Sequence, residues 1–109
     1  MKTSYFANAR KINRNKYFLI SIALGNARCK IDAQAKLLAP KREWIGLEYN
    51  EYESLYLGKL NSLPEDFFIQ MKDAASPKEP VFLCFESLKN KGQWCHRRLL
   101  AEWIEEKYN

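Results

Sequence analysis

The chain has 109 residues, which is enough for one domain with one core and too few for two. Its 47% hydrophobic and 14% aromatic content excludes intrinsic disorder. A net charge of +5 favours a phosphate-bearing partner. The excess positive charge lies mostly in the first 42 residues, where Asp32 is the single acidic residue. We therefore predict a single domain over 1–109 with one basic half.

The chain shows neither an export signal nor a membrane-spanning segment, since the apolar run 17–24 is far too short to cross a bilayer. We therefore expect a cytoplasmic protein, in the host cytoplasm if it is phage-encoded, with no membrane partner. Cys29, Cys84 and Cys95 are odd in number and form no CxxC pair, and the only histidine is His96. This pattern predicts no disulfide framework, no metal and no cofactor.

The first half of the chain predicts two strands followed by an irregular segment. Residues 2–6 form a candidate strand, and residues 17–23 form a second that is rich in aromatic and branched side chains. Gly25-Asn26 is a turn signal, and residues 27–42 have little periodicity.

Two helices are predicted next. Residues 48–60 place tyrosines and leucines on one broad apolar face. Ser62-Leu63-Pro64-Glu65 resembles a capping box that opens another helix, which Ser76-Pro77 stops.

The last third of the chain predicts a buried strand and an amphipathic helix. Val81–Glu86 is nearly all apolar, which is typical of a strand that is buried on both faces. We expect this strand to be central, with parallel neighbours. A polar loop follows, and from Cys95 the spacing of the apolar residues fits a helix. The predicted fold is a single compact α/β domain whose small, mostly parallel sheet is flanked by helices, with a ligand pocket at the carboxyl ends of the strands.

The most informative motif is Cys95-His96-Arg97-Arg98, at the start of that last helix. The first turn of a helix carries unsatisfied N–H groups and partial positive charge, so basic side chains there favour an anion. With Leu100 at the centre of the apolar face, His96 lies about 40° to one side and Arg97 about 60° to the other. Arg97 should therefore point inward.

Helical phase gives the next residue a different environment. Arg98 points to solvent, where it can pair with Glu102 four residues later. Arg97 needs an internal partner, and Glu86 at the end of the preceding strand is the obvious one. The alternative is that Arg97 and Glu86 form a structural ion pair, that His96 is a core histidine with its hydrogen bonds satisfied, and that Cys95 is a small buried residue at a helix cap.

Motifs over nearly the whole chain resemble those of one family. They are Thr3-Ser4-Tyr5-Phe6, Ile20-Ser21-Ile22, Leu38-Ala39-Pro40, Tyr49 to Tyr56, Phe82-Leu83-Cys84-Phe85-Glu86, Cys95-His96-Arg97 and Ala101-Glu102-Trp103. With them the chain resembles domain of unknown function family 488, in particular its short phage and bacterial members. The resemblance implies a compact α/β fold with a pocket lined by the Cys-His-Arg turn, the strand-ending Glu86 and polar residues of the first strand. Longer relatives carry an Asp-x-Arg motif where this chain has Ser21-Ile22-Ala23.

The first functional hypothesis is a module that binds a small phosphorylated ligand of the nucleotide type. Arg97 would grip a phosphate, with His96 and the backbone N–H groups beside it, and Glu86 would orient Arg97 or accept from a ribose or base. Thr3, Ser4, Tyr5 and Trp94 complete the predicted ligand-binding set. The resemblance to phage proteins adds one concrete role, the sequestration of a nucleotide immune signal.

Two further hypotheses belong to other classes. In an enzyme, Cys95 would be the nucleophile, since a thiol at a helix start beside His and Arg is activated. In a nucleic-acid accessory protein, the basic half would bind phosphates with a steep salt dependence. Aromatic residues are numerous for one small core, with six Tyr, six Phe and three Trp, and this favours a homo-oligomer.

Overall fold

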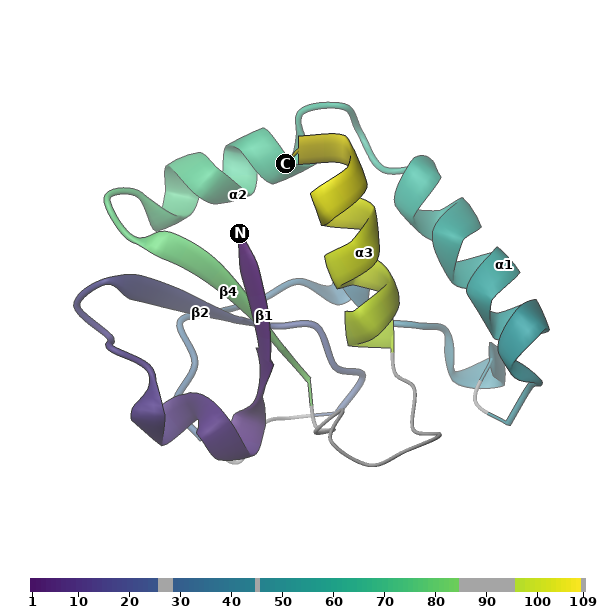
Figure 1. The fold of residues 1–109 in the computed structure, drawn as a ribbon, viewed down its shortest axis with the longest axis horizontal. Coiled ribbons are helices and arrows are strands. Elements are labelled where there is room, and N and C mark those ends of the chain that lie inside the picture. The colour runs from purple at the N-terminus through teal and green to yellow at the C-terminus, as the bar shows by residue number, and fades with distance from the viewer. Residues whose placement is uncertain (26–28, 45, 85–95, 109) are drawn as a thin grey trace.

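The structure is a computed structural model that describes residues 1–25, 29–44, 46–84 and 96–108. These residues form four strands and three α-helices (Figure 1). In chain order the elements are β1 (Lys2–Tyr5), a 3-10 helix (Phe6–Lys11), β2 (Tyr17–Ser21), β3 (Ala33–Gln34), two short 3-10 turns (Lys36–Leu38 and Arg42–Trp44), α1 (Tyr49–Asn61), α2 (Phe67–Ala75), β4 (Glu79–Cys84) and α3 (His96–Tyr108).

The sheet is entirely parallel, with the strand order β1-β4-β2-β3. β4 is central, because Val81 pairs with Lys2 of β1 on one side and with Leu19 of β2 on the other. This confirms the predicted fold class and the predicted position of the last strand. Every residue of β4 from Pro80 to Cys84 is buried, which explains why its sequence is a continuous apolar run.

The two faces of the sheet have separate cores, because side chains alternate along each strand. Ile20, Phe82 and Cys84 belong to the core that faces the three α-helices. Leu19, Val81 and Leu83 belong to the other core, which the 3-10 helix covers with Phe6 and Ala9.

The order of the strands explains which segments cover which face. The chain moves from β1 past β4 to β2 and then to β3, and the connecting segments pack on the face of Leu19 and Leu83. From β3 it returns to β4 through α1 and α2, which pack on the opposite face. Two crossover connections of the same handedness lie on opposite faces of a sheet when they run in opposite directions across it. The crossovers from β1 to β2 to β3 and the return from β3 to β4 therefore fit a single handedness.

Several boundaries differ from the predicted ones. α2 begins at Phe67, and its N-cap residue is Asp66 rather than Ser62, so the proposed capping box was wrong. Proline cannot continue a helix, and α2 ends at Ala75, just before Ser76-Pro77, as predicted. The segment 27–42 was predicted to be irregular, but it contains β3 and a 3-10 turn.

Candidate functional site

α3 begins at the edge of the sheet toward which the strands run (Figure 1). The link is direct, since the Nε2 atom of His96 lies 2.7 Å from the carbonyl oxygen of Ile22, which follows β2. The first turn of α3 therefore stands at the carboxyl ends of the parallel strands. In open α/β sheets this is the edge where ligands bind.

His96 is a core residue, only 5% exposed. A carbonyl oxygen only accepts hydrogen bonds, so Nε2 carries a proton and donates a hydrogen bond to the carbonyl oxygen of Ile22. The other ring nitrogen, Nδ1, lies 3.9 Å from the sulfur of Cys84. The ring of Tyr56 stands edge-on to the imidazole, with the two ring centres 5.5 Å apart. His96 thus joins α3 to β4, to α1 and to the segment after β2.

The inward direction of Arg97 agrees with the helical phase, since the residue is 8% exposed. Its Nη1 lies 3.4 Å from the hydroxyl oxygen of Thr3, a long hydrogen bond. Its guanidinium carbon lies 6.0 Å from the centre of the Tyr5 ring, within range of a cation–π contact. Thr3 and Tyr5 pair with Phe82 and Cys84, so both lie on the helix-covered face of the sheet.

Arg98 has the solvent-facing position that helical phase predicts. Its Nε lies 3.4 Å from Oε1 of Glu102, and both side chains are more than half exposed. Two consecutive arginines therefore have different environments.

Ser4 is separated from the other residues of the predicted ligand-binding set. Strand alternation turns it to the opposite face of the sheet, where its hydroxyl oxygen accepts a hydrogen bond from Asn8 at 3.0 Å. The structure thus brings Thr3 and Tyr5 to Arg97 and leaves Ser4 with the 3-10 helix. The predicted roles of Glu86, Trp94 and Cys95 fall on residues outside the described ranges.

Cys84 and Tyr56 are neighbours of His96 that no sequence motif assigns to the site. Both lie in apolar patterns, which predicted core positions, and both are indeed buried. Only the three-dimensional fold brings them to the imidazole, from residues 12 and 40 positions away along the chain, and neither carries a local sequence signal for this contact.

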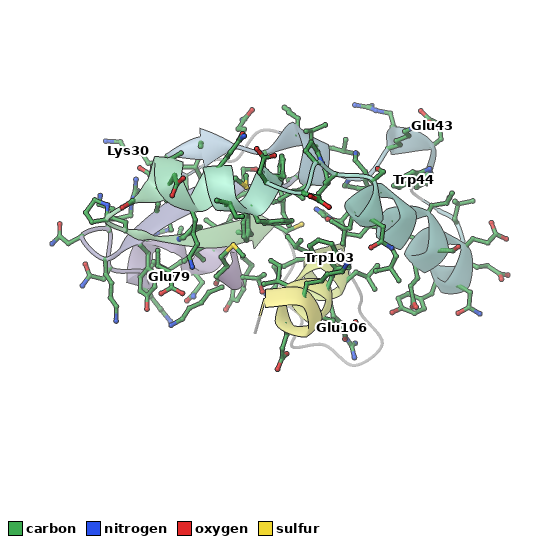
Figure 2. The ribbon with its side chains drawn as sticks, turned by 90° about the horizontal axis from the view of Figure 1, so that it is seen from above. Lys30, Glu43, Trp44, Glu79, Trp103 and Glu106 are labelled. Carbon is green, nitrogen blue, oxygen red and sulfur yellow. The ribbon has the colours of Figure 1, made fainter. Side chains whose placement is uncertain are left out.

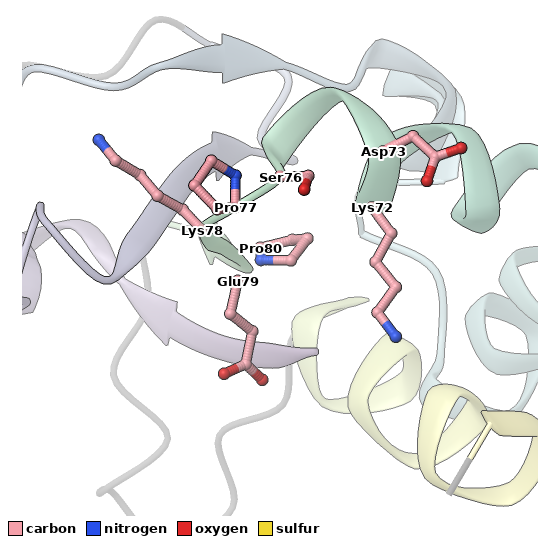
Figure 3. A pocket seen from close by; sticks show the side chains of 7 residues that line it. All are labelled: Lys72, Asp73, Ser76, Pro77, Lys78, Glu79 and Pro80. Carbon is pink, nitrogen blue, oxygen red and sulfur yellow. The ribbon is translucent and has the colours of Figure 1, made fainter.

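A second surface feature lies at the other end of β4. An open cleft of about 440 Å³ is lined by the last turn of α2 and the first residues of β4 (Figure 3). Its lining carries both signs of charge, with Lys72 and Lys78 pointing in opposite directions (Figure 3). This cleft lies at the amino end of the strand, opposite to the edge where the sequence predicts a pocket.

The described residues contain no group of three or more His, Cys, Asp or Glu side chains that could hold a metal ion. Within the same residues, no helix combines the length and the apolar character needed to cross a bilayer. No protein-family model, curated protein or solved structure matches the chain.

Proposed function

We propose that the chain binds a small phosphorylated ligand of the nucleotide type at the amino-terminal end of α3. The observation that carries this proposal is the position of Arg97. Arg97 is 8% exposed as a residue and lies one position inside the start of the helix, with its guanidinium group next to Thr3 and Tyr5. Burying a cation is costly, and the first turn of a helix already favours negative charge. A phosphate would stabilise both the buried Arg97 cation and the first turn of α3.

Each neighbour of Arg97 has a distinct task in this proposal. The guanidinium group binds the phosphate in a bidentate fork, and the Thr3 hydroxyl group adds a polar contact beside it. The Tyr5 ring supplies an aromatic surface close to the cation. His96 has a supporting task, because its Nε2–H is already used by Ile22 and holds the helix start against the sheet.

We also propose that the chain belongs to domain of unknown function family 488, because it carries motifs resembling that family's from Thr3-Ser4-Tyr5-Phe6 to Ala101-Glu102-Trp103. In this view Glu86 and Trp94 complete the binding set, and the chain sequesters a nucleotide signal in the cytoplasm of a phage host. Sequestration needs tight binding and no turnover, so it requires no catalytic group. The sequence-based expectation of a homo-oligomer belongs to the same proposal.

Isothermal titration calorimetry with a panel of mono-, di- and cyclic nucleotides tests this function. We expect one nucleotide class to bind the unmodified chain, and Arg97→Ala to weaken that binding by roughly 3–5 kcal/mol. Arg98→Ala is the matched control, and it should change the binding free energy by less than about 1 kcal/mol. If both variants bind as the unmodified chain does, the phosphate is not held by Arg97.

A second candidate function is that of a cysteine-dependent enzyme acting on a nucleotide, phosphate or sugar substrate. The observation that favours it is the thiol–imidazole contact of 3.9 Å between Cys84 and His96. The sequence favours Cys95, at the helix start, as the nucleophile. Alkylation by iodoacetamide near pH 6, followed by peptide mass mapping, separates these cases, because only an activated thiol reacts quickly at that pH. Inert Cys84 and Cys95 would remove this function.

A further inference from the structure

The indole ring of Trp44 has two ammonium groups beside it. The Nζ atom of Lys41 and the Nζ atom of Lys59 each lie 5.9 Å from the ring centre. The two lysines come from different elements, since Lys41 precedes the 3-10 turn Arg42–Trp44 and Lys59 belongs to the last turns of α1. Figure 2 shows Trp44 beside α1, at the other end of the molecule from Glu79.

Hydrogen bonds fix the backbone that carries this cluster. The Tyr56 hydroxyl group donates to the carbonyl oxygen of Leu38 at 2.6 Å, and the Lys59 ammonium group donates to that of Ala39 at 2.5 Å. The backbone N–H of Trp44 donates to the carbonyl oxygen of Lys41 at 3.0 Å, which closes a turn. The segment just before Pro40 is therefore bonded to α1, and the turn that carries Lys41 and Trp44 follows it directly.

The two ammonium groups of this cluster repel each other. Burial lowers the pKa of Lys59, and the positive charge of Lys41 lowers it further. The ion pairs of the described residues join Met1 to Glu79, Arg14 to Asp32 and Arg98 to Glu102, and they leave out both lysines of this cluster. The positive charge of Lys41 thus acts on the ammonium group of Lys59, and an anion that contacts both groups would relieve this repulsion.

A similar cluster of two lysines and one aromatic ring lies at the amino end of the sheet, and there a carboxylate of the protein offsets part of the positive charge. There Lys2 and Lys16 lie 5.0 Å and 5.5 Å from the centre of the Tyr17 ring. Lys2 donates to the Tyr17 hydroxyl oxygen at 2.9 Å, and the charge of Glu79 acts on it as well. Among the described residues, no carboxylate forms an ion pair with Lys41 or Lys59. The cluster around Trp44 is therefore the better anion site of the two.

We propose that Lys41, Lys59 and Trp44 form a second anion site, which binds the phosphate group of a nucleotide or of a single-stranded nucleic acid. The two ammonium groups contact the phosphate oxygens, and the half-buried indole ring offers an edge or face to the attached base. The site is built from α1 and the segment before it, so it is separate from the site proposed at α3.

The test follows the indole N–H resonance of Trp44 in two-dimensional proton–nitrogen NMR spectra, assigned by its loss in Trp44→Phe. Titrations use inorganic phosphate, adenosine monophosphate, adenosine and a short oligothymidylate. We expect the phosphate-bearing probes to shift this resonance and adenosine to leave it in place. If the oligothymidylate binds more tightly than the mononucleotide, the natural ligand is a strand, and the reverse order indicates a free nucleotide.

Matched variants assign the response to the two lysines. Lys41→Gln, at an exposed position, should weaken phosphate binding at Trp44 by about tenfold. Lys107→Gln is the control, because Lys107 also lies over an indole ring, at 5.4 Å from the centre of Trp103, in the last part of α3. It should change the dissociation constant by less than about twofold.

A third variant separates this site from the one at α3. Arg97→Ala should leave the Trp44 response intact, whether or not it abolishes nucleotide binding at the first site. Loss of the response in Arg97→Ala, an equal response to adenosine, or no response to any phosphate-bearing probe would overturn the inference.

Discussion

Arg97 and Arg98 are neighbours in one helix and carry the same side chain, yet one is 8% exposed and the other 56% exposed in its side chain. A step of about 100° around α3 turns the first toward Thr3 and the second toward Glu102. Helical phase alone therefore gives identical chemistry two different environments.

The first prediction concerns the stability of the free protein. Arg97→Ala should lower the free energy of unfolding by roughly 1–3 kcal/mol, because the buried stem and guanidinium group lose their packing against Thr3 and Tyr5. Arg98→Ala should lower it by less than about 1 kcal/mol, since its pair with Glu102 is exposed. Urea unfolding of both variants measures the difference, and equal effects would contradict the assignment by helical phase.

The second prediction concerns His96. His96→Phe should lower the free energy of unfolding by about 1–3 kcal/mol, because the Ile22 carbonyl group loses a hydrogen-bond donor inside the protein. The imidazole of the unmodified chain should be protonated at Nε2, which nitrogen chemical shifts of the ring report directly. A ring protonated only at Nδ1 would contradict the bond to Ile22.

The third prediction concerns acid stability. The carboxylate of Asp32 accepts a hydrogen bond from the Leu19 N–H at 2.7 Å and one from Arg14 at 2.7 Å. Burial acts to raise the pKa of Asp32, but these hydrogen bonds and the charge of Arg14 together outweigh it, and the pKa is lowered from 3.8. A lowered pKa means that the carboxylate stabilises the fold at every pH above its pKa in the unfolded chain. This contribution is lost as the pH falls through the pKa of Asp32 in the folded protein.

Asp32→Asn should therefore lower the free energy of unfolding at pH 7 and make it less sensitive to acid below about pH 4. Thermal melts at pH 7, 5, 4 and 3 check this expectation. Glu65→Gln, at an exposed position, serves as the control. An Asp32→Asn curve parallel to that of the unmodified chain would contradict the lowered pKa of Asp32.

The fourth prediction concerns the core. Phe82 is fully buried in the central strand and packs edge-on against Phe68, with ring centres 6.0 Å apart. Phe82→Ala should cost about 3–5 kcal/mol, because it leaves a cavity between the sheet and α2. Ile69→Ala, in the same helix as Phe68 but 56% exposed, should cost less than about 1 kcal/mol. Chemical denaturation of the two variants makes the comparison.

The central strand was predictable because burial on both faces leaves a local sign, an unbroken apolar run, in the sequence of β4. In α1 a helical period predicted one apolar face made of Tyr49, Tyr52, Leu55, Tyr56 and Leu60. Tyr52, Tyr56 and Leu60 are indeed the buried residues of that helix, whereas Leu55 is 43% exposed. Patterns of this kind depend on each residue's own burial, so a single sequence contains them.

β3 had no such sign, because Ala33–Gln34 is two residues long and is held by pairing with Ile20 and Ser21, far earlier in the chain. In the candidate site, the inward turn of Arg97 followed from helical phase. The contacts of His96 with Ile22 and Cys84 did not, because they depend on how three separate elements come together. The side to which Ser4 points depends on strand register, which the sequence left open.

The two outer strands of the sheet are both short, four residues in β1 and two in β3. Exposed edge strands act as templates for pairing with other chains, and short edges limit that hazard. Edge-to-edge growth of the sheet into fibres is therefore disfavoured by the architecture itself. If copies of this chain associate, the contact is expected to use helical surfaces, where Leu55 of α1 and Ile69 of α2 are exposed, rather than a continuous sheet across two subunits.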